Sequence, residues 1–218
     1  MRLSLTDQVH GALVDGDLVL LDVAADAYYC LPAGDQSLAL EGRRLDVTPD
    51  LLAQALCEAG LAAPPDAVAE PSAPIAPTSP SRTARAILET DPVLARPPAR
   101  WRHLSALVRA GLTARRAQSR AFVERLDPRA AAPKPLSAAL LGDLAIYRRL
   151  SPWAPFDGLC LFRSEMLRAY LRCLGHDATW VFGVRTWPFS AHCWLQIGDV
   201  ALDDEAERLA AYHPILAV

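Results

Sequence analysis

Short apolar runs separated by turn residues fill the first third of the chain. VHGALV, LVLLDV and YYCL follow one another within residues 7–31, and Asp15 and Gly16 separate the first two runs. An Asp-Gly turn between apolar runs is a strong signal for a β-hairpin. The pattern therefore predicts a three-stranded antiparallel meander over residues 7–31.

Helical spacing follows the meander. We expect a short helix over residues 35–41 and a longer one that ends at Gly60, with Thr48 as its N-cap and Pro49 in the first turn. The apolar stripe expected on the longer helix consists of Leu51, Leu52, Ala55 and Leu56. Residues 1–62 thus predict a small winged-helix-like unit, a β-meander plus helices.

Proline interrupts the pattern next. Residues 63–81 carry prolines at positions 64, 65, 71, 74, 77 and 80. No periodic apolar face survives this spacing, so the segment is expected to be a partly extended linker. The chain is therefore divided into an N-terminal unit over residues 1–62 and a larger unit over residues 82–218.

The larger unit begins with helical patterns. One helix is expected to reach about Arg125, and another is expected to begin after the N-cap Ser137 and to end near Leu150. The apolar stripe expected on the first consists of Leu104, Leu107, Val108, Gly111 and Leu112. We expect both helices to form walls of a catalytic domain.

The stretch from residue 156 to residue 204 carries the candidate chemistry. An amphipathic helix is expected from Cys160 to Gly175, followed by two strand-like runs, TWVFGV and HCWLQI. A turn at Gly198 then brings an acidic pair, Asp203 and Asp204, back beside the second run. The whole unit is accordingly of the α+β class.

The order Cys160, His192, then an acid suits a thiol nucleophile, its base and the group that orients the base. Orphan N–H groups at a helix N-terminus favour a thiolate and a developing oxyanion. A buried structural cysteine fits Cys160 equally well, and a lone histidine in an apolar run is more often a packed core residue. Cys193 is expected to face away from His192, which argues against it as the nucleophile. Adjacent Asp203 and Asp204 point opposite ways, so only one can orient the imidazole.

Composition excludes several other classes. The five cysteines are scattered without a CxxC pair, so neither a disulfide framework nor a metal site is expected. Residues 1–70 carry twelve acidic and three basic residues, and residues 82–149 carry fourteen basic and five acidic ones. The basic segment lacks interleaved aromatics, which argues against nucleic acid as a partner. The N-terminus does not resemble a signal peptide and no run suits a membrane span, so a cytoplasmic protein is expected.

Short motifs in both units carry a family resemblance. The C-terminal set is Cys160-Leu161-x-Arg163-Ser164, Gly175, Phe182-Gly183-Val184, Ala191-His192-x-Trp194 and Asp204, and the N-terminal set is Leu20-Leu21-Asp22, Tyr28-Tyr29 and Leu31-Pro32. With these motifs the chain resembles the lasso-peptide biosynthesis B protein, a fused precursor-recognition element and transglutaminase-like leader peptidase. Three positions differ from the usual family pattern: Phe162 stands in place of Pro, Cys193 in place of Ala, and Asp203 in place of Asn.

The resemblance implies a papain-like or transglutaminase-like cysteine peptidase with Cys160 as nucleophile, His192 as base and Asp204 as orienter. It also implies that a precursor leader binds near Tyr28, Tyr29, Leu31 and Leu52. The freed core peptide would pass to an ATP-dependent cyclase similar to asparagine synthetase, and neither a cofactor nor a metal is implied. The same residues also suit an acyl transferase, or a leader-binding scaffold without catalysis.

Overall fold

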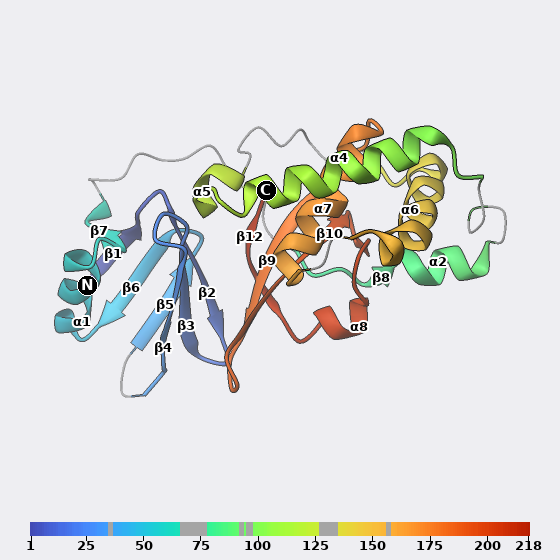
Figure 1. Ribbon diagram of the computed structural model, residues 1–218. Coiled ribbons are helices and arrows are strands. Elements are labelled where there is room, and N and C mark those ends of the chain that lie inside the picture. The colour runs from blue at the N-terminus through green and yellow to red at the C-terminus, as the bar shows by residue number, and fades with distance from the viewer. Residues whose placement is uncertain (35–36, 66–77, 92–93, 95–97, 127–134, 156–157) are drawn as a thin grey trace.

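The computed structural model describes residues 1–34, 37–65, 78–91, 94, 98–126, 135–155 and 158–218. Strands dominate the N-terminal part, and helices pack on a sheet of their own in the C-terminal part (Figure 1). The expected α+β class is therefore confirmed. The expected linker falls largely on residues 66–77, outside the described residues. None of the described helices is long and apolar enough to cross a bilayer.

The expected meander is present as three antiparallel strands, β2 (Val9–Val14), β3 (Asp17–Asp22) and β4 (Ala27–Leu31). Asp15 and Gly16 form the first turn with φ values of 52° and 91°. These left-handed values are why an Asp-Gly pair suits a tight hairpin turn. The sheet order is β2-β3-β4, so β4 has a strand neighbour on one side only among the described residues.

A second sheet completes the N-terminal part. Its order is β5-β6-β1-β7, formed by β1 (Arg2–Leu5), β5 (Ser37–Glu41), β6 (Arg44–Thr48) and β7 (Ala62–Ala63). The prediction of a helix over residues 35–41 is wrong, because residues 37–41 pair with β6 as a strand. Tertiary pairing decides the conformation of so short a segment against its local propensity.

The helix α1 (Asp50–Glu58) lies beside this sheet and also differs from expectation. Thr48 belongs to β6, and Pro49 is the N-cap without a side-chain bond. The buried positions are Ala53 and Leu56, whereas Leu51 is 75% exposed. Since α1 is the only α-helix that the structure describes among residues 1–65, the winged-helix-like arrangement is not confirmed.

The C-terminal part is built on a five-stranded sheet with the order β12-β9-β10-β11-β8. Its strands are β8 (Arg82–Thr83), β9 (Thr179–Arg185), β10 (Ser190–Ile197), β11 (Val200–Ala201) and β12 (His213–Ala217). The helices are α2 (Ala84–Thr90), α4 (Trp101–Ala117), α5 (Phe122–Arg125), α6 (Ala138–Leu150), α7 (Cys160–Cys173) and α8 (Ala206–Leu209), with a 3-10 turn over Ser151–Trp153.

The long helix α4 packs along α7 (Figure 1). The stripe expected on α4 is confirmed for Leu107 and Gly111, which are buried, and is wrong for its other three residues. Leu104, Val108 and Leu112 are exposed. The face turned inward consists of His103, Ala106, Leu107, Ala110, Gly111, Ala114 and Ala117. Small side chains on this face let the two helix backbones approach closely. This close packing outweighs the burial of the larger side chains and sets the orientation of α4.

One buried carboxylate ties the helices together. Asp143 on α6 binds His103 on α4 at 3.0 Å, His176 after α7 at 2.9 Å and Arg102 at 2.9 Å. Burial alone would raise the pKa of Asp143, but the hydrogen bonds from His176 and His103 and the Arg102 charge lower it. The ionised carboxylate therefore links α6 to α4 and to the end of α7 through hydrogen bonds.

The meander contributes to the core of the C-terminal part. Val14, Val19, Leu21 and Val23 belong to the same buried apolar cluster as residues of α4, α6, α7, β9 and β10. The opposite face of the meander supplies Val9, Leu18 and Leu20 to a separate cluster with α1 and the second sheet. The meander therefore lies between two apolar cores and connects them.

Candidate active site

Cys160 is the first residue of α7, so its thiol lies where the helix begins. Leu159 is the N-cap and makes no side-chain capping bond. Ser164, one turn later, donates its hydroxyl to the carbonyl oxygen of Cys160 at 2.9 Å and is itself fully buried. The first turn of α7 therefore keeps its backbone N–H groups clear of side-chain caps among the described residues, and its positive end faces the thiol.

His192 lies on β10, directly opposite Gly183 of β9. The turn at Gly198 pairs β10 with β11, and the chain then returns past the imidazole. His192 Nε2 lies 2.6 Å from Asp204 Oδ2, and both side chains are largely buried. With Nε2 bonded to the carboxylate, Nδ1 is the ring nitrogen left for Cys160.

The two neighbouring acids have different partners. Asp203 Oδ1 accepts a hydrogen bond from the backbone N–H of Leu195 at 2.8 Å. Asp204 Oδ1 accepts one from the backbone N–H of Glu205 at 2.8 Å, and its Oδ2 faces the imidazole and also Arg208 at 3.4 Å. The geometry therefore selects Asp204, rather than Asp203, as the partner of His192.

Electrostatics in this cluster favour a thiolate and an imidazolium. Hydrogen bonds from the Cys193 side chain and from His192 lower the pKa of the Cys160 thiol to about 4, against the opposing effect of burial. The hydrogen bond with Cys160 and the one with Asp204 raise the pKa of His192 above its ordinary value, although burial acts the other way. A nucleophilic ion pair at neutral pH is the expected result.

Cys193 is a neighbour of the thiol that sequence reasoning missed. It is 4% exposed, its side chain is hydrogen-bonded to Cys160, and its Sγ lies 3.3 Å from Ser164 Oγ. Strand alternation argues against a role for Cys193, but α7 packs against β10 and both Cys193 and His192 interact with Cys160. The presence of Cys193 where the family usually has Ala is the sequence feature that could have pointed to this neighbour.

Aromatic side chains hold the imidazole in place. The His192 ring stacks on Trp194 with centroids 6.3 Å apart and lies 5.4 Å from the Tyr212 ring. Gly183 is required here, since a Cβ at this position would approach Trp194 to 2.7 Å. The motif Phe182-Gly183-Val184 therefore gives the indole the room it needs beside the histidine.

The N-terminal part reaches the same site. The Tyr28 ring on β4 lies 5.8 Å from that of Phe189, and Trp187 Nε1 donates to Asp17 Oδ2 at 2.8 Å. Burial, followed by the proximity of the Cys193, Asp26 and Cys160 side chains, raises the pKa of Tyr28. Tyr28 thus lies within electrostatic reach of the candidate nucleophile.

The other expected peptide-binding residues are separated from Tyr28. Tyr29 follows Tyr28 on β4 and is 41% exposed. Leu31 and Leu52 border the second apolar cluster, away from the catalytic core. Cys30, on the same strand as Tyr28, is exposed. Of the four expected residues, only Tyr28 packs against the same apolar cluster as Cys160.

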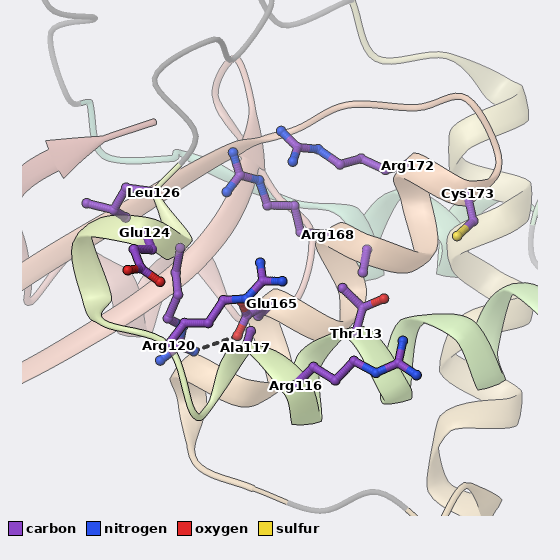
Figure 2. A pocket seen from close by; sticks show the side chains of 12 residues that line it. Thr113, Arg116, Ala117, Arg120, Glu124, Leu126, Glu165, Arg168, Arg172 and Cys173 are labelled. Atoms are coloured by element: carbon purple, nitrogen blue, oxygen red, sulfur yellow. Dashed lines mark hydrogen bonds and ion pairs between the residues drawn. The ribbon is translucent and has the colours of Figure 1, made fainter.

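A separate arginine-rich cavity of about 790 Å³ lies between α4, α5 and α7 (Figure 2). It is lined by Thr113, Arg116, Ala117, Arg120, Glu124, Arg125, Leu126, Glu165, Arg168, Ala169, Arg172 and Cys173. Glu165 inside it pairs with Arg125. Cys160 does not line this cavity. The described residues also contain no group of three or more His, Cys, Asp or Glu side chains able to hold a metal ion.

Comparison with known proteins gives one match. The model of the Transglutaminase-like superfamily matches residues 103–217, which is more than half of the chain. The matched segment contains Cys160, His192 and Asp204. Members of this superfamily generally have a cysteine peptidase or transferase fold. No curated protein and no solved structure matches the chain.

Proposed function

The chain belongs to the transglutaminase-like superfamily, and on that premise we propose that it is a cysteine peptidase that removes the leader from a ribosomally made precursor peptide. The observation that carries the proposal is the hydrogen-bonded series of Cys160 at the start of α7, His192 on β10 and Asp204 after β11. In it a nucleophile, a base and an orienter stand in the order that thiol hydrolysis needs.

The reaction begins with attack of the Cys160 thiolate on the scissile carbonyl carbon. The oxyanion that forms is stabilised by backbone N–H groups in the first turn of α7. The His192 imidazolium then donates its proton to the leaving amine, which releases the core peptide and leaves the leader as a thioester. Water, deprotonated by His192, hydrolyses the thioester, while Asp204 keeps the imidazole in the required orientation.

The leader-recognition role is supported by the open edge of β4. An extended peptide can add to such an edge through backbone hydrogen bonds. Tyr28 and Tyr29 project from this strand to opposite faces, and Tyr28 lies near Cys160. A leader bound along β4 would therefore run directly toward the nucleophile, and little chain would be needed between the recognised segment and the scissile bond.

The family resemblance extends the proposal to lasso-peptide biosynthesis. Removing the leader frees an amino group at the start of the core peptide. Macrolactam formation from that amino group needs an activated carboxyl group, so an ATP-dependent cyclase of the asparagine-synthetase type is the proposed partner. No metal or cofactor enters the proposed peptidase step.

The test uses a short precursor peptide with a leader, to be sought among the reading frames next to this gene. The wild-type protein should cut it into two fragments, while Cys160→Ala should abolish cleavage and retain leader binding. Fragment masses separate hydrolysis from acyl transfer, because transfer to an amine gives a conjugate in place of a free leader. Cleavage that continues unchanged in Cys160→Ala would overturn the proposal, and leader binding without any cleavage by the wild type would support a scaffold.

A further inference from the structure

Two thiols meet in the candidate active site, although the proposed reaction uses one. The side chains of Cys160 and Cys193 are hydrogen-bonded to each other. Ser164 links the Cys193 side chain to the backbone of Cys160, since its Oγ lies 3.3 Å from Cys193 Sγ and donates to the Cys160 carbonyl oxygen at 2.9 Å. The three residues form one cluster between the start of α7 and β10.

The two thiols differ in access. Cys160 is half-buried, whereas Cys193 is 4% exposed. A small oxidant from solvent therefore meets Cys160 first. The thiolate form reacts with peroxides and the thiol form does not, so Cys160 is also the more reactive of the pair.

We propose that Cys160 and Cys193 are a redox modification site, at which a peroxide converts the pair into a reversible disulfide. The disulfide removes the nucleophile and protects it from irreversible oxidation. The inference rests on the proposed role of Cys160 as the reactive thiolate, and it adds a regulation that the proposed peptidase reaction does not require.

The chemistry balances in two steps. The Cys160 thiolate attacks one peroxide oxygen, the O–O bond breaks, and sulfenic acid and hydroxide form. The Cys193 sulfur then attacks the Cys160 sulfur, the S–O bond breaks, and the Cys193 proton leaves with the departing oxygen in water. The two thiols together lose two electrons to the peroxide, and a dithiol reductant returns them.

The environment of Cys193 changes during the first step. The hydrogen bond to the Cys160 thiolate is the largest cause that raises the pKa of Cys193, and burial is the second. When Cys160 becomes a neutral sulfenic acid, the negative charge of its thiolate, which raises the pKa of Cys193, is lost. Cys193 therefore becomes easier to deprotonate once Cys160 is oxidised, which is when its attack is needed.

Closing the bond requires side-chain rotation, because a disulfide needs an S–S distance of about 2.05 Å. The remaining cysteines lie on other elements: Cys30 on β4, Cys57 on α1 and Cys173 at the end of α7. Replacing all three with serine gives a variant whose only cysteines are the proposed pair.

The experiment treats the folded triple-serine protein with hydrogen peroxide and follows its intact mass. A disulfide lowers the mass by about 2 Da, and dithiothreitol restores it. Tryptic mapping should link the peptide 150–163 to the peptide 186–208. The matched variant Cys193→Ser should instead gain two or three oxygen atoms at Cys160, and reductant should not reverse the change. Mapping of the wild-type protein gives the same readout if the triple variant does not fold.

Two results would overturn the inference: sulfinic acid accumulating at Cys160 at the same rate with and without Cys193, or a trapped sulfenic acid that never becomes a disulfide. The mass readout does not depend on peptidase activity. If the disulfide forms in a protein that cleaves no precursor, the modification site is supported and the proposed function is contradicted. Cleavage without a linked pair removes this inference alone.

Discussion

At the scale of single residues, the site depends on which of two adjacent carboxylates faces His192. Alternation along a strand already shows that only one of Asp203 and Asp204 can do so. It does not show which one, because the choice depends on the exact return of the chain after Gly198. Asp204 takes the position at 2.6 Å, and Asp203 is occupied by the Leu195 N–H.

The pair provides a matched test. Asp204→Asn should lower kcat for precursor cleavage by about 10²–10⁴-fold, because an amide orients the wrong imidazole tautomer and does not stabilise the imidazolium. Asp203→Asn keeps an oxygen for the Leu195 N–H and should change kcat by less than about tenfold. Steady-state kinetics on both variants checks this, and the reverse order of effects would reassign the orienting acid.

Cys193 affects the nucleophile even without oxidation. Its hydrogen bond is the largest cause of the lowered pKa of Cys160. Cys193→Ala should therefore shift the rise of iodoacetamide alkylation at Cys160 from about pH 4 upward by roughly one pH unit, the equivalent of one hydrogen bond to a charged group. Cys193→Ser retains a donor and should shift it less.

The same pKa shifts fix the sign of the pH profile for cleavage. Below about pH 4 the Cys160 thiolate is protonated and loses its nucleophilicity. Above the raised pKa of His192, the imidazolium loses the proton that the leaving amine needs. Cleavage activity is expected to lie between these two pH limits.

The alkylation experiment has its own contradicting outcome. Equal alkylation profiles for wild type, Cys193→Ala and Cys193→Ser would contradict the role given to Cys193.

At the scale of elements, motifs with strong local causes could be predicted from the sequence. The Asp15-Gly16 hairpin, the Ser137 cap of α6 and the helix from Cys160 each have a short-range signal, and each is present. Residues 37–41 and the orientation of α4 were mispredicted, since pairing with β6 and close packing on α7 decide them. Those contacts join segments distant in the sequence, and local periodicity carries no information on them.

The open edge of β4 yields a prediction for leader binding. Tyr29→Ala should weaken leader affinity by roughly tenfold, because an exposed aromatic anchor on the docking strand is lost. The fold should tolerate the change, since the side chain is 41% exposed. Leu51→Ala, on the exposed side of α1, is the control and should leave affinity unchanged. Titration calorimetry with the isolated leader measures both, and equal affinities would place the leader elsewhere.

At the scale of the whole molecule, the N-terminal part is more than a recognition element joined by a linker. Its meander supplies four residues to the core beneath the catalytic residues, and Asp17 anchors the β9–β10 hairpin through Trp187. Sequence patterns could predict two apolar faces on the meander but not what each face covers. The strand proposed to bind the leader and the proposed nucleophile therefore share one packed body.

This shared core predicts coupled unfolding. All five tryptophans lie after residue 100, so their fluorescence reports mainly the C-terminal part, and only Trp187 among the described residues is hydrogen-bonded to the meander, through Asp17. Leu21→Ala, in the meander, leaves a cavity worth about 3 kcal/mol and should lower the fluorescence-detected Tm by roughly 10 °C. Leu51→Ala should leave it unchanged. A normal Tm for Leu21→Ala would mean that the two parts unfold independently.

The central claim is that Cys160 forms a thioester with the leader during cleavage. Rapid acid quench of the protein mixed with its precursor, followed by mass spectrometry, measures this most directly. The account predicts a transient adduct equal to the leader mass on the peptide 150–163, absent from Cys160→Ala. Cleavage of the precursor with no adduct at any time, and with undiminished rate in Cys160→Ala, would contradict it.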